Sequence, residues 1–237
     1  MHIQTIGSGS SGNCYMISDD HTTILLEAGI KFDKVQKALN FKTRKVRGCF
    51  ITHEHGDHSK YTKDYLKAGL NCYMTPGTKD ALNLNHHRLF TLNYKQTTRI
   101  GSLVIMPYET QHDVAESCGY LIKSDHGSKL LFATDTYYIK YKFPGVTHML
   151  LEVNHDYNYM QGRVDSGALH PALANRIMKS HLNLENAIKY LQASNLDQLR
   201  EIHLIHISKD NGLRNHFKEE IQKVTGVPVK IAGAHKL

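Results

Sequence analysis

Three histidines and one aspartate fall within six consecutive residues of this 237-residue chain, His53-Glu54-His55-Gly56-Asp57-His58. Neutral imidazole nitrogen is a preferred ligand of zinc and of neighbouring transition metals, and a carboxylate oxygen completes such a site. A calcium or magnesium site would instead be built almost wholly from oxygen atoms. The pattern therefore predicts a metal centre in preference to a solvated histidine-rich turn. Zinc is favoured, with manganese or iron as alternatives.

The spacing of the four side chains indicates two metal ions. His53 and His55 are two residues apart and can bind one ion, whereas Asp57 and His58, beyond the intervening glycine, can turn toward a second. Two adjacent cations suit hydrolysis, because they lower the pKa of a shared water molecule, hold the electrophile and stabilise the charge that develops on its oxygen atoms. The metal chemistry alone does not name the substrate.

Short apolar strands and amphipathic helices alternate along the chain and must position these ligands. We expect an antiparallel meander of strands at 3–6, 14–17 and 23–27. The metal segment should follow a strand at 48–52 and precede a helix at 59–68. Further strands are expected at 102–107, 119–122, 129–133, 149–153 and 202–207, and further helices at 32–39, 75–82, 184–191 and 213–224. Residues 157–179 lack clear periodicity, which predicts a loop near the site that contacts substrate, with Arg163 and Arg176 as candidates for phosphate binding.

The histidine-rich segment resembles the H-x-H-x-D-H signature of the metallo-β-lactamase-fold hydrolases. That family also carries a third histidine, a bridging aspartate and a last histidine, each at a strand end, and this chain offers His112, Asp135 and His206 in the same order. The resemblance implies an α/β fold, a four-layer αββα sandwich. It assigns His53, His55 and His112 to one metal ion, Asp57, His58 and His206 to the other, and Asp135 to the bridge between them.

Two N-terminal segments also resemble the family. Glu27, in Leu-Leu-Glu-Ala-Gly, stands where the family has an aspartate that orients metal ligands through hydrogen bonds, so the extra methylene bears on local geometry more than on the number of ligands. A glutamate on the protein surface is the alternative. The glycine- and serine-rich loop at 7–13 lies at the rim of the active site in the family, which makes it a candidate for substrate contact. A flexible turn is the alternative there.

Glu152 and His181 form a candidate catalytic pair. Glu152 ends an expected strand and His181 precedes an expected helix, which resembles the phosphodiesterase branch of the family, where a glutamate pairs with a catalytic histidine. An imidazolium held beside a carboxylate can act as the general acid for a leaving alkoxide. Together with Asp57, these residues are the expected catalytic set. The alternative is a histidine without a role at the start of a helix.

Composition sets the class of the protein. The length fits one domain over residues 1–237, and no linker divides it. The formal net charge of +7 favours acidic or polyanionic partners. The four scattered cysteines form no C-x-x-C pair and are typical of a reducing compartment, so we expect a cytoplasmic protein. We expect no membrane partner, because no run of about 18 apolar residues and no apolar leader is present.

Three features favour phosphodiesters over lactams and thioesters, all of which are turned over on this fold: the Glu152 and His181 pair, the basic charge and the 7–13 loop. Over nearly its whole length the chain is most similar to the small WalJ/YycJ-type exonuclease and phosphodiesterase group. We therefore expect a phosphodiesterase or nuclease that acts on nucleic acid, with DNA preferred to RNA, a metal-bound hydroxide as nucleophile and His181 as general acid. A thioester or small-ester hydrolase with the same ligands is the alternative. A non-catalytic nucleic-acid-binding domain is disfavoured because the ligand set is complete.

Overall fold

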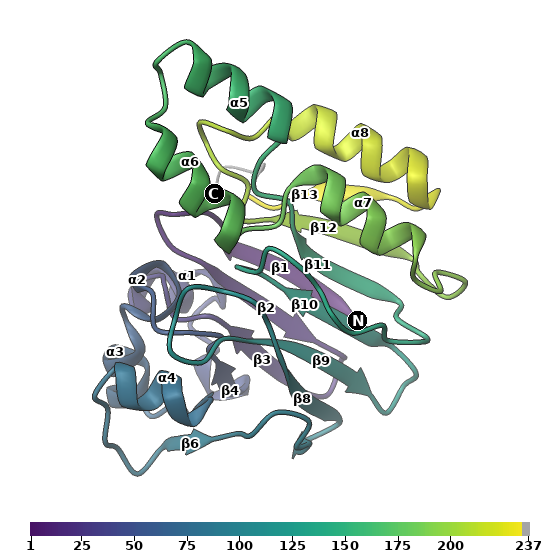
Figure 1. Ribbon diagram of the computed structural model, residues 1–237. Coiled ribbons are helices and arrows are strands. Elements are labelled where there is room, and N and C mark those ends of the chain that lie inside the picture. The colour runs from purple at the N-terminus through teal and green to yellow at the C-terminus, as the bar shows by residue number, and fades with distance from the viewer. Residues whose placement is uncertain (234–237) are drawn as a thin grey trace. The chain divides into compact units, whose positions relative to one another are not determined.

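The computed structural model describes residues 1–233 (Figure 1). The chain divides into two compact units. Unit 1 comprises Met1–Glu109 and Val114–Ser128, and unit 2 comprises Thr110–Asp113 and the described residues from Lys129 on. The interpretation of residues 1–237 as a single domain stays a prediction.

Unit 1 contains a six-stranded sheet whose strands follow one another in chain order. The strands are β1 (His2–Gly7), β2 (Cys14–Ser18), β3 (Thr23–Leu26), β4 (Val46–Phe50), β5 (Cys72–Met74) and β6 (Leu89–Thr91). β1, β2 and β3 are antiparallel, as the expected meander requires, whereas β3 to β6 are parallel. Parallel neighbours need long crossover connections, and these connections contain the helices of unit 1.

Those helices pack on one face of the sheet. They are α1 (Phe32–Ala38), the 3₁₀ turn η1 (Thr43–Lys45), α2 (Gly56–Ser59), α3 (Thr62–Lys67) and α4 (Pro76–Ala81). Val35 of α1 and Leu66 of α3 share one buried cluster with Leu25 and Cys49 of the sheet. The start of α4 is as expected, with Thr75 as the N-cap and Pro76 as the first helical residue.

The helix expected at 59–68 is present but shorter, because α3 begins only at Thr62, and the separate short helix α2 precedes it in the metal segment. The chain leaves the helical hydrogen-bond pattern at Tyr61, whose backbone N–H donates to the carbonyl oxygen of Ala28 at 3.0 Å. The backbone N–H of Ala28 in turn donates to the backbone carbonyl oxygen of His58 at 2.7 Å. These two bonds fasten the metal segment to the end of β3, which is a tertiary contact that helical periodicity does not reveal.

A second layer of strands in unit 1 packs against the first sheet. β7 (Thr98–Ile100), β8 (Leu103–Glu109) and β9 (Cys118–Ser124) are antiparallel neighbours. The hydroxyl of Tyr120 donates to the carbonyl oxygen of Ile51 at 2.7 Å, and its ring meets that of Phe50 edge-on with centroids 5.5 Å apart. This packing supports the end of β4, from which the metal segment leaves.

Unit 2 is built on four parallel strands. They are β10 (Lys129–Ala133), β11 (His148–Glu152), β12 (Glu201–Ile205) and β13 (Val229–Ile231), which are neighbours in that order. α7 (Leu184–Gln192) and α8 (Arg214–Thr225) contact one another, and α8 ends at Gly226 with a left-handed φ of 69°, as expected for a glycine cap. Since the carboxyl ends of parallel strands meet at one edge of a sheet, Asp135, Glu152 and His206 are brought to the same edge.

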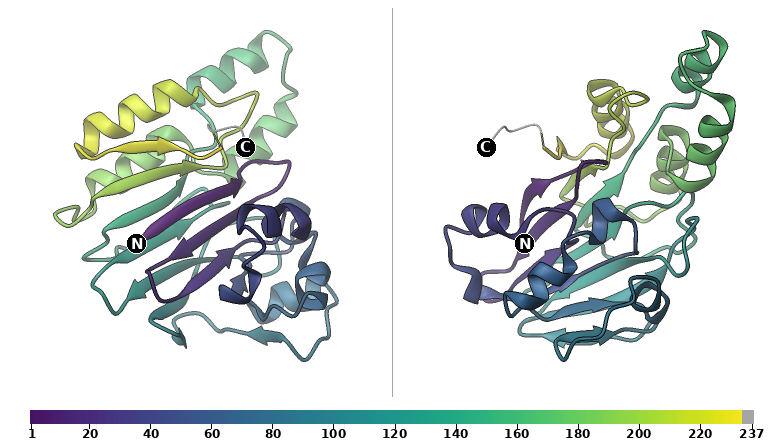
Figure 2. Two further views of the ribbon diagram at one scale, coloured as in Figure 1. Left: turned by 180° about the vertical axis from the view of Figure 1, so that it is seen from behind. Right: turned by 90° about the vertical axis from the view of Figure 1, so that its left-hand side faces the viewer.

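The loop expected at 157–179 is wrong. This segment forms α5 (Tyr157–Asp165) and α6 (Pro171–Ser180), which run side by side as a helical hairpin (Figures 1 and 2). Asp156 caps α5 by accepting from the N–H of Tyr159 at 2.7 Å, and His170 with Pro171 begins α6. The hydrophobic periodicity is weak in α5 but clear in α6, so both the caps and the apolar face of α6 were signals of helix in this segment.

Candidate metal centre

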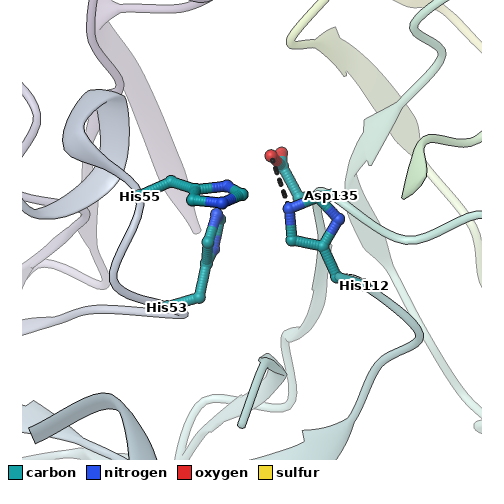
Figure 3. Close-up of side chains that lie close together, drawn as sticks. All are labelled: His53, His55, His112 and Asp135. Atoms are coloured by element: carbon teal, nitrogen blue, oxygen red, sulfur yellow. Dashed lines mark ion pairs between the residues drawn. The ribbon is translucent and has the colours of Figure 1, made fainter. Parts of the chain in front are cut away.

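The first group of candidate ligands lies in unit 1, between the end of β4 and α2. His53 and His58 are fully buried, and the His53 ring lies 4.9 Å from that of His55 and 4.3 Å from that of His58, measured between centroids. In Figure 3, His53 and His55 extend from the same segment toward a common point. Buried imidazoles that converge in this way, beside the carboxylate of Asp57, match the donor set of a zinc-like divalent ion.

A buried carboxylate orients His53 through a threonine. The hydroxyl of Thr52 donates to Oε1 of Glu27 at 2.7 Å, so its oxygen accepts from Nδ1–H of His53 at 2.8 Å. This arrangement leaves Nε2 as the nitrogen of His53 that could bind a metal ion. Because Glu27 is fully buried, the alternative of a surface glutamate is wrong. Burial raises the pKa of Glu27, and the charge of His58 and the bonds from Thr52 oppose that shift.

His58 lies between the same carboxylate and the N-terminal loop. Its Nδ1 is 3.5 Å from Oε1 of Glu27, while its Nε2 is 3.4 Å from Oδ2 of Asp57 and 3.2 Å from Nδ2 of Asn13. Nε2 of His58 and the Asp57 carboxylate are therefore adjacent, as expected for two ligands of one ion. Glu27 thus supports both the histidine expected at the first ion and the histidine expected at the second.

The glycine- and serine-rich loop borders this group. The amide oxygen of Asn13 accepts from the N–H of Gly9 at 2.8 Å and from the Tyr15 hydroxyl at 3.1 Å, and the Asn13 N–H donates to the carbonyl of Asp57 at 2.8 Å. A Cβ on Gly29 would lie only 1.8 Å from that Asp57 carbonyl oxygen, so no larger residue fits there. The loop is thereby fixed beside the metal segment, and its contact with substrate stays a prediction.

The second group of candidate ligands lies in unit 2, just beyond β10, β11 and β12. One ligand atom from each of Asp135, Glu152, His181 and His206 lies within 4.8 Å of the other three. Asp135 stands between two imidazoles, with Oδ2 at 3.7 Å from Nε2 of His112 and Oδ1 at 3.7 Å from Nδ1 of His206. Figure 3 shows the His112 contact as a dashed line. A carboxylate placed in this way fits the role of a bridge between two cations.

The α6 helix orients His112. Nδ1 of His112 donates to the carbonyl oxygen of Ser180, the last residue of α6, at 2.9 Å, so Nε2 faces Asp135. Asp113 beside it pairs with Nε of Arg176 at 3.0 Å in an exposed ion pair. Arg176, expected as a phosphate-binding candidate, therefore has a carboxylate partner within its own unit.

Glu152 and His181, the expected catalytic pair, are in direct contact. Oε1 of the fully buried Glu152 accepts from Nδ1 of His181 at 2.7 Å, and Oε2 accepts from the backbone N–H groups of Thr136 at 3.2 Å and Leu182 at 3.3 Å. Oε1 is also 3.3 Å from Nδ1 of His206. Burial alone would lower the pKa of His181, but the charge and hydrogen bond of Glu152 outweigh burial and raise it. The His181 side chain keeps 18% exposure, so one edge of the ring reaches solvent.

Three residues of the two groups have left-handed backbone conformations. The φ angles are 69° at Glu27, 46° at Asp135 and 50° at His206. Such conformations cost a non-glycine residue on the order of 1–3 kcal/mol and persist where the surrounding structure enforces them. Each of the three turns a side chain sharply at the end of a strand, which is where the candidate ligands have to converge.

Comparison with known proteins identifies the family. Residues 22–207 match the family model described as a beta-lactamase superfamily domain. The chain belongs to this superfamily. It is 25% identical to exodeoxyribonuclease YycJ of Bacillus anthracis over 94% of this chain and 89% of the relative. It is 26% identical to exodeoxyribonuclease WalJ of Streptococcus pneumoniae strain D39 over 88% of this chain and 82% of the relative.

Two solved structures have the same fold as this chain. The metallo-β-lactamase fold protein YhfI of Bacillus subtilis aligns with a TM-score of 0.74 at 16% identity, covering 97% of this chain and 95% of that one. The short form of human tRNase Z aligns with a TM-score of 0.64 at 14% identity, covering 88% and 93%. The expected α/β fold of the metallo-β-lactamase type is thereby confirmed, and the chain is a metal-dependent hydrolase. Among the helices of residues 1–233, none has the length and apolarity needed to cross a bilayer.

Sequence reasoning missed several residues that support this superfamily site. Thr52, Asn13 and Ser180 act through hydrogen bonds to candidate ligands, and Asn154 donates through Nδ2 to the carbonyl of His206 at 2.9 Å. Thr52 could have been found from its position in the chain, directly before the candidate ligand His53. No local signal marks Ser180, because its contact with His112 is made by a backbone carbonyl.

The cysteines do not offer an alternative nucleophile. All four are buried and free. Burial raises the pKa of the Cys14 thiol to about 12 and that of Cys118 even further, so neither is a thiolate at neutral pH. The chemistry of this superfamily member therefore rests on its histidines and carboxylates.

Proposed function

We propose that the chain is a phosphodiesterase that hydrolyses nucleic acid, with DNA preferred to RNA. The observation that carries the proposal is the hydrogen-bonded pair of Glu152 and His181, which adds a proton donor to a set of metal ligands. The exodeoxyribonuclease relatives YycJ and WalJ support the same substrate class.

The proposed ligands divide between two divalent ions. His53, His55 and His112 would hold one ion, Asp57, His58 and His206 the other, and Asp135 would contact both. The imidazole-rich donor set favours zinc, with manganese and iron as alternatives. When bound, the two ions lower the pKa of water and stabilise charge on the phosphate oxygens.

His181 supplies the proton that the leaving group needs. Its Nδ1 is engaged by Glu152, so Nε2 is the ring atom that delivers a proton. Glu152 is itself fixed by two backbone N–H groups, which keeps the imidazole in one orientation. This is the role of a general acid beside its orienting carboxylate.

The general acid favours phosphodiesters over the alternative class of thioesters. A thiol has a pKa of about 8.5, so a thiolate leaves without a proton, whereas a sugar alkoxide is far more basic. A residue built to protonate the leaving atom therefore gives a large rate advantage with nucleic acid and little with a thioester.

The test is a comparison of substrates with one metal-loaded preparation. Labelled single- and double-stranded DNA and RNA, with the label at the 5′ or the 3′ end, are digested beside bis-p-nitrophenyl phosphate and a glutathione thioester. We expect chelator-sensitive cleavage of nucleic acid and of the phosphodiester, with DNA cut faster than RNA. Turnover of the thioester without cleavage of any nucleic acid would contradict the proposal and favour the thioesterase alternative.

A further inference from the structure

The positive charge of the chain is concentrated in one stretch of unit 1. Residues 31–67 contain ten of the 29 lysines and arginines but only four of the 22 aspartates and glutamates. This stretch therefore carries +6 of the formal net charge of +7. The positive charge is therefore concentrated in this stretch and is not spread evenly along the chain.

This stretch presents its cations on the outer side of the helices. α1 and α3 lie side by side, with the rings of Phe32 and Tyr65 5.1 Å apart, and their apolar residues face the sheet. Six exposed cations of α1, η1 and α3 define what we call the basic face: Lys34, Lys37, Arg44, Lys45, Lys63 and Lys67. None of the six is a candidate metal ligand.

The cations of the basic face lack the carboxylate partners found elsewhere. Four other exposed cations form ion pairs, namely Arg99 with Asp125, Arg176 with Asp113, Lys223 with Glu220 and Lys230 with Glu201. Within residues 1–233, no member of the basic face makes such a pair. The exposed carboxylates of Asp33 and Asp64 leave the stretch with a net positive charge, and a net positive charge attracts a polyanion.

An exposed aromatic side chain belongs to the same basic stretch of the chain. Phe41, between α1 and η1, is 71% exposed and has a φ of 59°, directly after Asn40 at 48°. The backbone is held there by the Phe41 N–H, which donates to the carbonyl of Gln36 at 2.7 Å. A bulky residue is unfavourable in this left-handed conformation, and because the Phe41 side chain is exposed, burial of the ring does not offset the conformational cost. An exposed ring in a stretch of chain rich in cations suits stacking on an unpaired base.

A cavity adjoins the α3 end of the basic face. Its volume is about 360 Å³, and Lys63, Lys67, Asn83, Asn85 and His86 line it together with two leucines. The lining contains no carboxylate, so its charge matches that of the neighbouring surface. A cavity of cations and amides is a suitable receptor for a phosphate or a nucleotide.

We propose that the basic face binds the sugar–phosphate backbone of nucleic acid, with an unpaired base stacked on Phe41. The inference rests on the proposed function, because it gives the nucleic-acid substrate a second contact made by residues other than the metal ligands. Lysine contacts to phosphate carry affinity and no sequence information, so binding is independent of sequence. An anionic bilayer is the other polyanion to test, and a single exposed aromatic ring offers it little apolar area.

The test measures binding of the metal-loaded protein to phosphorothioate oligonucleotides, which resist hydrolysis and keep the phosphate charge. In the variant Lys34→Ala/Lys37→Ala/Lys63→Ala/Lys67→Ala, we expect weaker binding and a shallower dependence of log Kd on log salt concentration. The slope should fall by about 0.7 per lost contact for single strands and by about 0.9 for duplexes. The matched control, Lys123→Ala/Lys189→Ala/Lys209→Ala/Lys218→Ala, removes the same charge elsewhere and should keep most of the slope.

Phe41→Ala separates stacking from charge. It should weaken single-strand binding roughly 5- to 150-fold, the range for one stacked base, and leave the salt slope unchanged, while Phe41→Trp restores binding. Turnover of bis-p-nitrophenyl phosphate should be the same in all these variants as in the wild type. If the wild type does not cleave nucleic acid, the proposed function is contradicted, whereas the binding measurements still test the basic face.

Three outcomes would overturn the basic face as a nucleic-acid surface. The first is an unchanged Kd and slope in the four-lysine variant. The second is an equal loss in the control variant, which would mean that net charge alone matters. The third is binding of the wild type to phosphatidylserine vesicles without measurable affinity for the oligonucleotides, which would assign the surface to a membrane.

Discussion

The candidate ligands of the two units are assembled in opposite ways. In unit 1, four candidate ligands come from one six-residue segment, and a single buried carboxylate, Glu27, supports two of them. In unit 2, each candidate residue follows a different strand or helix, and Ser180 of α6 and Asn154 support His112 and His206 separately. Local backbone therefore places the first group, whereas the tertiary fold places the second. Substitutions in the two units should accordingly fail in different ways.

The largest effect is expected at Asp57, in the contiguous group. Asp57→Ala removes a ligand and its negative charge together, so the second ion should be lost and turnover should fall to background. Elemental analysis after mild dialysis should find close to two ions per chain in the wild type and close to one in the variant. Asp64→Ala, an exposed carboxylate of α3, is the control and should change neither quantity. Two ions and normal turnover in Asp57→Ala would remove Asp57 from the site.

Among the candidate residues of unit 2, the largest effect on a single reaction step, protonation of the leaving oxygen, is expected at His181. If Nε2 protonates the leaving oxygen, His181→Ala should lower kcat for nucleic acid by about 10²- to 10⁴-fold and leave metal content and folding unchanged. A nitrophenyl phosphodiester should be far less affected, because p-nitrophenolate leaves without a proton. Steady-state kinetics with both substrates give the comparison.

Glu152 provides the graded control for His181. Glu152→Gln keeps the shape of the side chain but removes the charge that orients the ring and stabilises its protonated form, so it should show the same selectivity more weakly. Equal slowing of both substrates in His181→Ala would mean that the residue acts through binding or structure. Loss of bound metal would instead make His181 a ligand, as its closeness to Asp135 and His206 allows.

The contrast between the units explains which candidate residues could be predicted from the sequence. Spacing alone predicted the segment from His53 to His58 as a metal site, because its candidate ligands are neighbours in the chain. Residues at strand ends could be identified as candidates only through their order, and the structure places Asp135, Glu152 and His206 at one sheet edge. Assignment of each ligand to an ion stays a prediction.

Two aspects of the structure were not accessible from sequence, whereas a third was. The left-handed conformations at Glu27, Asp135 and His206 are imposed by tertiary packing, since none of these residue types favours them as glycine does. In the α5–α6 hairpin only α5 has a weak hydrophobic periodicity, whereas α6 is amphipathic and begins with His170 and Pro171, so a helix there could have been recognised. The role of Glu27 as a support for two histidines depends on contacts with residues about 25 or more positions away, which no local pattern encodes.

A smaller effect is expected at Thr52, which transmits the influence of Glu27 to His53. Thr52→Val removes the hydroxyl but keeps the branched shape, so His53 loses its orienting partner. Metal affinity, measured by competition with a chelator, should fall by about 10- to 100-fold, as for other residues that support ligands. Thr52→Ser keeps the hydroxyl and should stay close to the wild type. Equal affinities in the valine and serine variants would show that Glu27 acts without this relay.

The smallest effect is expected at Asn183, the cap of α7. Asn183 lies two residues after His181, and its side-chain oxygen accepts from the backbone N–H of Asn186 at 2.7 Å. Asn183→Ala leaves that donor unsatisfied and should lower the free energy of unfolding by about 1 kcal/mol, measured by urea denaturation, whereas Asn183→Ser should recover most of the loss. Since His181 is held by Glu152 and not by the cap, kcat for nucleic acid should stay within a few-fold of the wild type. A selective loss like that of His181→Ala would mean that the helix start, and not the carboxylate alone, positions the general acid.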